Sequence, residues 1–513
     1  MYTVAAGLAA QPSYDLVVYG GTAGGVITAV AGAREGLKVA LLEPGRRLGG
    51  MVSGGLGRTD HGKKETIGGL SLEFFKRVGR HYGEDITWYF EPHAAEQVFQ
   101  EMVKEAGVTV LYQHRLKERG GVRKMGREVS EIVMENGARF RARVFADATY
   151  EGDLMAQAGV SYTWGREGSA QYNESLAGVR PTDRSHMFEV RVSPYDRAGK
   201  LLREIQPGPR GPLGVADKKV QAYNFRMCLS NDPANQAPFP KPANYDPRRY
   251  ELLARLIKAL AERDGKPPRM NQIMIVSPLP NNKTDINNYG AFSTDYIGKS
   301  WDYPTASYQR RARIWQDHRD YVAGFFYFLA HDPQVPQPLQ QEINRWGLAR
   351  DEFTDTAHWP HQLYVREARR MVGDFVMTQK DIQTELSKDD AIGMGSYNSD
   401  SHNVERYVTE DGAVQNEGNM EVPVTPYQVT YRVMLPKRSE CTNLLVPVCF
   451  SASHVTYSTL RMEPVYMIIG QAAGLAAKMA IEGGKPVQDI DTRALTAKLR
   501  AQGAVLTYDL NRP

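Results

Sequence analysis

The segment 14–43, YDLVVYGGTAGGVITAVAGAREGLKVALLE, constrains the fold more than any other part of this chain. An apolar run at 15–19 predicts a buried parallel strand, and a second run at 38–42 predicts its neighbour. A glycine-rich turn (20–25) and a helical stretch (26–34) lie between the two runs. This order predicts a βαβ unit at the start of an α/β, Rossmann-like parallel sheet that binds a dinucleotide.

The glycine turn carries the binding chemistry of this unit. Glycines allow a tight turn and let backbone N–H groups approach a pyrophosphate, which the positive end of the following helix also attracts. Glu43 lies 23 positions after Gly20, where an acid accepts hydrogen bonds from the adenosine ribose. Read from Gly20, the middle glycine of GxGxxG is replaced by Thr22, and the alternative is an ordinary turn that caps a helix. The expected cofactor-binding residues here are Gly20, Gly21, Thr22, Ala23, Gly24, Gly25 and Glu43.

The length, charge and cysteine content of the chain restrict the classes of protein to which it can belong. The chain has 513 residues, which predicts two or three domains and a large core. The net charge is +4 without a basic block, so nucleic acid is not an expected partner. Runs of the ~18 apolar residues that span a bilayer are not found. Cys228, Cys441 and Cys449 show neither CxxC nor metal spacing, which argues against a redox dithiol and leaves the redox compartment open.

The first ten residues, MYTVAAGLAA, are apolar and small but lack a basic start. They are also shorter than a secretory signal. They are interpreted as a disordered leader or as the remnant of a signal, so the protein is expected to be cytoplasmic or exported.

The rest of the N-terminal part continues the sheet. Residues 51–62 are rich in glycine and predict a loop, and 91–106 have helical apolar spacing. A third strand is expected at 108–112. Apolar residues at 129–134, at 140 and at 144–146 predict a small β insertion that returns to the main sheet. The segment 147–153 ends this strand and precedes 154–158.

The middle of the chain differs from both ends in amino-acid composition and pattern. Residues 161–428 are rich in proline, aromatic and Asn/Asp residues, and they contain no second strand–GxGxxG–helix pattern. Helical pieces are expected at 248–263 and 306–328. At the end, 443–448 predict a buried strand, 449–462 a polar loop and 464–481 a helix that proline opens. The predicted domains are a discontinuous cofactor-binding domain (13–165 and 429–490), a large inserted α+β substrate-binding or cap domain (166–428) and a C-terminal tail (491–513).

Several of these motifs resemble a known family. The YGGTAGG turn, RLGG (47–50), DATYEGD (147–153) and SASHVTYSTLRMEP (451–464) followed by GQAAG (470–474) are similar to bacterial FAD-dependent oxidoreductases, often labelled xanthan lyase-like. The segments 281–290 and 358–375 extend the resemblance over nearly the whole chain. It implies a fold of the glutathione reductase type, non-covalently bound FAD and redox chemistry. The motifs do not support lyase activity.

The resemblance also implies a wall for the cofactor. The Arg-x-Gly-Gly after the second strand continues the wall in such flavoproteins, and the glycine-rich loop after it is expected along the flavin. If the last helix points at the flavin, its N–H groups and dipole favour the anion that forms on reduction. The further cofactor-binding residues expected are Pro44, Arg47, Gly49, Gly50, Met51, Ala148, Thr149, Asp153, Met462, Glu463 and Gly470.

The segment between the last strand and the last helix supplies the catalytic candidates. His454 is the predicted proton acceptor, because an imidazole titrates near working pH; the alternative is a structural histidine. Arg461 is expected to hold an anionic substrate or a flavin carbonyl, and a salt bridge to Glu463 is its alternative. Tyr457 is the third catalytic candidate.

A second group of residues is predicted at the substrate. His61 faces the substrate or carries a covalent flavin bond, unless it only contacts the cofactor edge. His402 and Asn398 lie in SYNSDSHN (396–403), which lines a polar pocket or forms a solvated turn. His358 and His361 flank Trp-Pro without a third ligand, so no metal site is expected.

The sequence therefore predicts an FAD enzyme that removes a hydride from an alcohol, a sugar or a related hydroxylated compound. No NAD(P)H domain is recognised, so oxygen or a separate carrier is expected to accept the electrons. The alternatives are a flavin amine oxidase, an NAD(P)H-driven flavin monooxygenase, and a protein that binds FAD without turnover.

Overall fold

The computed structural model describes residues 13–509; the predicted leader lies outside them. Its main sheet has the strand order β3-β2-β1-β6-β5-β4, and β20 also pairs with β6. The pairs of β1 with β2 and β6, of β2 with β3, and of β6 with β20 are parallel. The bounds are β1 Ser13–Tyr19, β2 Val39–Glu43, β3 Thr109–Tyr112, β4 Val122–Met125, β5 Glu128–Val133, β6 Arg139–Asp147 and β20 Leu444–Leu445. The predicted α/β, Rossmann-like class is confirmed.

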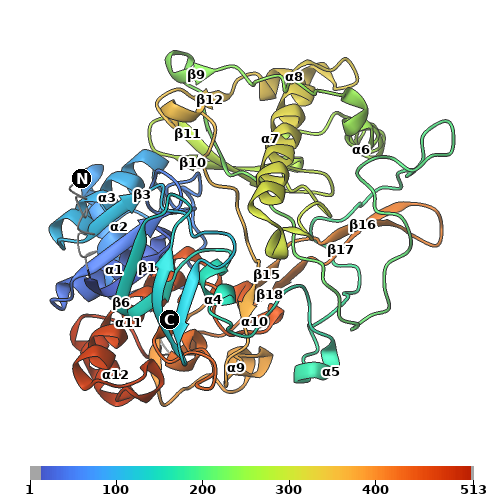
Figure 1. Ribbon diagram of the computed structural model, residues 1–513. Coiled ribbons are helices and arrows are strands. Elements are labelled where there is room, and N and C mark those ends of the chain that lie inside the picture. The colour runs from blue at the N-terminus through green and yellow to red at the C-terminus, as the bar shows by residue number, and fades with distance from the viewer. Residues whose placement is uncertain (1–12, 510–513) are drawn as a thin grey trace, which may run out of the picture.

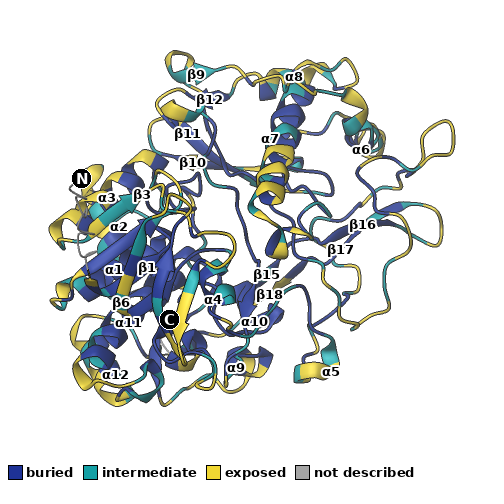
Figure 2. Cartoon of the chain, in the orientation of Figure 1, coloured by how far each residue is buried: buried dark blue, intermediate teal, exposed yellow. Residues whose placement is uncertain are grey.

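The alternation of β1 shows why this strand lies at the centre. Leu16 and Val18 pack into the core that holds the helices of this part, whereas Val17 and Tyr19 face a second core with the β insertion. Each face of the strand is covered, as expected for a continuous apolar run. Figure 2 shows this buried core in dark blue, with exposed residues on the outer loops and helix faces.

The predicted β insertion corresponds to β5 and β6, and the start of β6 pairs antiparallel with β5. The strand β4, which was not predicted, extends it as an antiparallel hairpin with β5. The second half of β6 leaves β5 and pairs with β20 instead, at Phe145 and Ala146. One long strand thereby connects the insertion with the C-terminal part of the chain.

Two apolar helices pack face to face beside the sheet. These are α1 (Ala23–Arg34) and α11 (Glu463–Gly483), and glycines bring them together: a Cβ at Gly470 would overlap the carbonyl oxygen of Gly24. By length and composition α11 would be able to cross a membrane, although the sequence analysis found no such run. However, 89% of its most apolar window is buried, so in this structure α11 is a core helix.

The middle of the chain forms a second sheet with its own helices. Its order is β10-β11-β8-β12-β9, and every pair is antiparallel. In Figure 1 the two chain ends share one half of the molecule, and the green and yellow middle elements occupy the other half. The bounds are β8 Met227–Ser230, β9 Gln236–Ala237, β10 Met274–Leu279, β11 Lys283–Asn288, β12 Gly347–Ala349, α6 Glu251–Asp264, α7 Tyr308–His331 and α8 Gln337–Ile343.

The helices near the ends differ in part from prediction. The segment 449–462 is buried throughout and contains α10 (His454–Leu460), so the predicted polar loop is wrong. Ser453 caps α10 by accepting a bond from Thr456 N, which is why a polar sequence starts a helix here. The sequence analysis also missed α2 (Gly69–His81) and α4 (Asp153–Gln157), whereas α3 (Pro92–Glu105) matches it closely. The predicted tail begins with α12 (Thr492–Ala501).

Candidate functional site

The glycine turn after β1 is shaped by close backbone approach. Gly20 has φ +104°, and a Cβ there would lie 2.7 Å from Thr149 N at the end of β6. A Cβ on Gly25 would overlap the carbonyl oxygen of Gly20. Both positions therefore need glycine, and the turn lies directly against Ala148 and Thr149.

Thr22 stands where the motif has its middle glycine, and its side chain stabilises the start of α1. It is the N-cap of α1: its Oγ1 accepts a bond from Gly25 N (3.1 Å) and donates one to Ala148 O (2.7 Å). The hydroxyl therefore satisfies one free N–H of the helix start and ties the turn to β6. Gly21 is the next neighbour, and its N–H donates to Glu43 Oε2 (2.8 Å).

Glu43 lies at the carboxyl end of β2 and lines the cavity described below. Its second oxygen accepts a bond from Gly45 N (2.5 Å). Burial raises the pKa of Glu43 to about 7, although the bonds from Gly45 and Gly21 oppose this shift. Hydroxyl donors from a ribose would stabilise the charged carboxylate further.

The Arg-x-Gly-Gly segment forms the next part of the wall. Gly49 N donates to Gly21 O (2.7 Å), and a Cβ on Gly50 would overlap the hydroxyl of Tyr150. That hydroxyl accepts a bond from Met51 N (2.9 Å) and donates one to Glu463 Oε1 (2.7 Å), at the start of α11. Three distant parts of the chain thus meet at Tyr150, which the sequence analysis did not single out.

These elements surround a cavity of about 450 Å³. Its walls combine the glycine turn, the end of β2, the segment after β6 and residues of the middle of the chain. The lining residues are Gly20, Thr22, Glu43, Pro44, Gly45, Arg46, Arg47, Gly50, Arg115, Thr149, Tyr150, Glu151, Tyr303, Trp315, Asp355, Thr356, His361, Gln362 and Leu363.

Several buried polar atoms around this cavity form no hydrogen bond with any residue that the structure describes. Arg47 pairs with Glu96 (2.5 Å) and with Asp355, but its Nε has no acceptor. Both ring nitrogens of His361 and Oε2 of Glu463 are also buried without a hydrogen bond. Such groups call for a ligand or water. The unpaired N–H donors and the glycine turn (20–25, called the glycine cradle below) suit the diphosphate of a dinucleotide, and Glu43 suits its ribose hydroxyls.

His361 gives a first testable prediction. Burial lowers its pKa to about 3, so the ring is neutral and can donate one hydrogen bond to the cavity occupant. His361→Leu is expected to raise the Kd of FAD by roughly 5- to 10-fold, the effect of one bond of about 1–1.5 kcal/mol. The measurement is titration of the apoprotein by flavin fluorescence quenching. His358→Ala is the control, because His358 does not line the cavity; equal Kd values for both variants would contradict the assignment.

The remaining cofactor candidates have other positions. Ala23 and Gly24 lie in the first turn of α1, and Gly24 packs on Tyr466 and Gly470 of α11. Met462 is the buried N-cap of α11. Within the described residues, Gly24 and Gly470 serve helix packing, and the cavity wall near them is formed by Gly20, Thr22 and Gly50.

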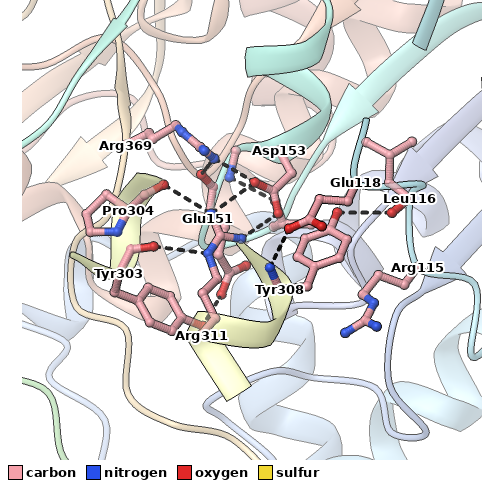
Figure 3. A network of polar contacts seen from close by, with 12 residues as sticks. Arg115, Leu116, Glu118, Glu151, Asp153, Tyr303, Pro304, Tyr308, Arg311 and Arg369 are labelled. Atoms are coloured by element: carbon pink, nitrogen blue, oxygen red, sulfur yellow. Dashed lines mark hydrogen bonds and ion pairs between the residues drawn. The ribbon is translucent and has the colours of Figure 1, made fainter. Parts of the chain in front are cut away.

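Asp153 is engaged by two arginines of the middle segment. Arg311 of α7 reaches both of its oxygens (2.6 and 3.1 Å), and Arg369 donates to Oδ1 (2.6 Å) and to Glu151 O (2.9 Å). Figure 3 shows these side chains converging with Tyr303, whose hydroxyl donates to Glu151 (3.0 Å). The network holds α7 against the segment after β6. A second cavity of about 230 Å³ lies here and shares Thr149 and Glu151 with the first.

Removing Arg311 tests the strength of this network. Arg311→Ala is expected to lower the free energy of unfolding by about 3 kcal/mol, because Asp153 loses a buried partner. The readout is the urea midpoint and the melting temperature of the FAD-loaded protein. Arg310→Ala is the matched control on the same turn, since its pair with Asp302 is exposed and is worth at most about 1 kcal/mol. A similar loss in both variants would refute the special role of Arg311.

The predicted catalytic residue His454 is enclosed. Its Nδ1 lies 2.8 Å from Glu367 Oε2 and its Nε2 lies 3.2 Å from Ser401 Oγ. Burial, aided by the charge of Arg370, lowers its pKa to about 3. The serine–histidine–acid order resembles a nucleophilic relay, but all three residues are buried, so the arrangement favours a structural role. Tyr457 is likewise buried, with its hydroxyl 2.9 Å from that of Tyr466.

Arg461, in contrast, belongs to a polar cluster, called the Tyr364 cluster below. Its Nη1 donates to Tyr364 Oη (3.0 Å) and its Nη2 to Asp400 O (2.8 Å). His402 lies in the same cluster, 2.7 Å from Asp295 Oδ2 and 3.8 Å from Asp400 Oδ1. The members are Asp60, Asn224, Asp295, Tyr364, Arg366, Tyr397, Asp400, His402 and Arg461.

The other substrate candidates lie near this cluster in the chain. His61 is half-buried, with Nδ1 2.7 Å from Gly62 O and its ring 5.2 Å from that of Trp88. Asn398 is half-buried between Tyr397 and Ser399. The sequence analysis missed Asp60, Tyr364 and Asp295. Asp60 directly precedes His61 at the end of the glycine-rich segment, which was the one signal that would have led to it.

One group of side chains of the kinds that bind metals already contacts a lysine ammonium. Oxygen and nitrogen atoms of Glu91, His93 and Glu352 lie within 4.8 Å of one another. The Lys283 ammonium lies 2.6 Å from Glu91 and 2.9 Å from Glu352, and therefore neutralises them. The three cysteines are buried and free.

Comparison with solved structures gives low similarity. L-proline dehydrogenase from P.horikoshii is 17% identical over 31% of this chain and 59% of that chain, with a TM-score of 0.25. THI4 of Thermovibrio ammonificans is 18% identical over 30% and 66%, with a TM-score of 0.24. A geranylgeranyl bacteriochlorophyll reductase-like protein of Thermoplasma acidophilum is 12% identical over 96% and 83%, with a TM-score of 0.37. These values carry no functional argument. No match was found among the curated proteins.

A family comparison is decisive instead. The family model described as FAD dependent oxidoreductase matches residues 15–499. The predictions of FAD as cofactor and of oxidoreductase activity are thereby confirmed, whereas the xanthan lyase-like label is not. The site described above, with its glycine cradle and Glu43, lies entirely within the matched region. The chain belongs to the FAD dependent oxidoreductase family.

Proposed function

We propose that this enzyme oxidises a hydroxyl-bearing small molecule at the Tyr364 cluster. Bound FAD supplies the hydride acceptor. The substrate carbon gives up its C–H hydride, the hydroxyl gives up its proton to a base of the chain, and a carbonyl product remains. Oxygen or a separate carrier then takes the two electrons.

The observation that carries this proposal is a half-buried carboxylate, Asp60, in a polar wall. Burial and the nearby charge of Asp400 raise the pKa of Asp60, and Tyr397 forms a hydrogen bond to it. A carboxylate with a raised pKa is a better proton acceptor near neutral pH. Asp60 also lies in the glycine-rich segment 51–62, which directly follows Gly50 of the cofactor cavity wall.

Other members hold the reacting groups in place. Arg461 bonds Tyr364 and lies 3.5 Å from Asp400 Oδ2, so it holds that side chain in place within the cluster. His454 lies under β15 (Ser399–Ser401) and fixes Ser401, next to His402. We therefore assign His454 and Tyr457 to positioning, Arg461 to substrate binding, and proton acceptance to Asp60.

Anaerobic bleaching of the FAD-loaded protein tests the proposal. Polyols, sugars and hydroxy acids are expected to bleach the yellow colour, whereas amines and NAD(P)H are not. Bleaching by amines alone would favour an amine oxidase, and bleaching by NADPH alone a monooxygenase. A flavin that no compound reduces would indicate a protein that binds FAD without turnover.

A further inference from the structure

Two buried arginines of the Tyr364 cluster have guanidinium nitrogens that form no hydrogen bond within residues 13–509. Arg366 donates from Nη1 to Ala222 O (2.5 Å), but its Nε and Nη2 lack a hydrogen-bond acceptor. Arg461 uses both terminal nitrogens, and its Nε has none. Arg226, also buried, shows the contrast, because two of its nitrogens bond Asp285 (2.8 and 2.7 Å). Buried charged donors without acceptors call for an anionic partner.

The charge of Arg366 is poorly compensated by the protein. Burial lowers its pKa, and the opposing attraction comes mainly from Asp295. Asp295 Oδ1 lies 3.1 Å from Arg366 Nη2 without hydrogen-bond geometry, and its Oδ2 is taken by His402. The single carboxylate of Asp295 is therefore shared between Arg366 and His402. Arg366 still has N–H groups that can bind a second anion.

The same cluster also has acceptors without donors. Asn224 donates from Nδ2 to Thr294 Oγ1 (3.2 Å), but its Oδ1 accepts no bond, and the same holds for Asp295 Oδ1. Hydroxyl groups are the neutral donors that such oxygens bind. The unpaired donors and acceptors of the cluster are thus complementary to one ligand that carries both an anionic group and hydroxyls.

Tyr364 connects this set with the cofactor cavity. The guanidinium carbons of Arg366 and Arg461 lie 4.5 and 5.9 Å from the centre of its ring. The preceding residues 361–363 line the cavity. A ligand between the two arginines would therefore lie next to the cavity rather than on a remote surface.

We infer that the substrate is a hydroxy acid, whose carboxylate binds Arg366 and Arg461 and whose hydroxyls donate to Asn224 or Asp295. This inference rests on the proposed oxidation of a hydroxylated compound and narrows its substrate class. A planar guanidinium fork suits a carboxylate, which accepts two bonds at once. The hydroxyl oxygens of a neutral polyol can accept bonds from these donors, but such a ligand leaves the buried positive charge without a counter-ion.

The wild-type, FAD-loaded enzyme provides the first test. Lactate, malate, gluconate and glucuronate are compared anaerobically with lactamide, glycerol and glucose, by the rate of flavin reduction in stopped flow. At least one acid is expected to reduce the flavin more than tenfold faster than its neutral counterpart. Equal rates for acids and neutral compounds would overturn the inference but leave the proposed function standing. Reduction by none of these compounds would overturn both.

Binding to an arginine variant provides a second test that needs no turnover. Calorimetric titration with propionate, and with propionamide as the neutral probe, compares wild type with Arg366→Gln and Arg366→Lys, all loaded with FAD. The Kd of propionate is expected to rise at least tenfold in Arg366→Gln and less in Arg366→Lys, while FAD retention is unchanged. Equal propionate affinity in wild type and Arg366→Gln would overturn the inference. If Arg366→Gln fails to fold, the acid and amide comparison on the wild type decides.

Discussion

Gly25→Ala is expected to abolish the retention of FAD through purification. The new Cβ would overlap the carbonyl oxygen of Gly20 and come within 3.0 Å of Ala148 Cβ. Relief requires the turn to move away from β6, which also breaks the bond from Gly25 N to Thr22 Oγ1. Overpacking of this kind costs roughly 1–3 kcal/mol or more, which corresponds to about 10- to 100-fold in the Kd of FAD.

A glycine of the other packed helix serves as the control. Gly483, the last residue of α11, has only ordinary contacts of 3.6–4.0 Å around an added Cβ. Gly483→Ala is expected to keep FAD and to be neutral or slightly stabilising, since alanine restricts the unfolded chain. The measurements are the ratio of absorbance at 450 nm to that at 280 nm after purification and the Kd on reconstitution. Full FAD content in Gly25→Ala would show that the turn is not the cofactor cradle.

Local patterns were sufficient to predict the cofactor side of the site. The βαβ unit, Glu43, Gly49 and Gly50 lie close together in sequence, so their spacing forms a pattern that can be recognised without the fold. The structure places Glu43 and Gly50 in the cavity wall, where the sequence analysis expected them. The role of Thr22 was harder to predict from the sequence, because its hydrogen bond to Ala148 O joins residues 126 positions apart.

The substrate side depends on contacts that no local pattern encodes. The Tyr364 cluster draws residues from 60 to 461, and the bond between His402 and Asp295 spans 107 positions. The segment 449–462 was expected to be a loop because it is polar, but its hydroxyls cap and pack α10 inside the protein. Sequence reasoning selected His454 for its chemistry, whereas burial among Glu367 and Ser401 decides its role.

Asp60→Asn is expected to slow reduction of the flavin by substrate by roughly 10²- to 10⁴-fold, the usual contribution of a general base. The amide keeps the size and the hydrogen bond from Tyr397 but cannot take a proton. FAD content should change little, because Asp60 does not line the cofactor cavity. Stopped-flow reduction under anaerobic conditions measures the step directly.

The pH dependence of Asp60 separates a base from a merely structural carboxylate. Only the deprotonated form accepts a proton, and the folded protein raises the pKa of Asp60 through burial and Asp400. The wild-type reduction rate should therefore fall as the pH drops through this raised pKa, at a higher pH than an ordinary aspartate would give. Asp60→Glu should retain a pH-dependent rate at reduced speed, whereas Asp60→Asn should lose this limb of the profile. If Asp60→Asn keeps both the wild-type rate and the acid limb, proton acceptance belongs to another residue.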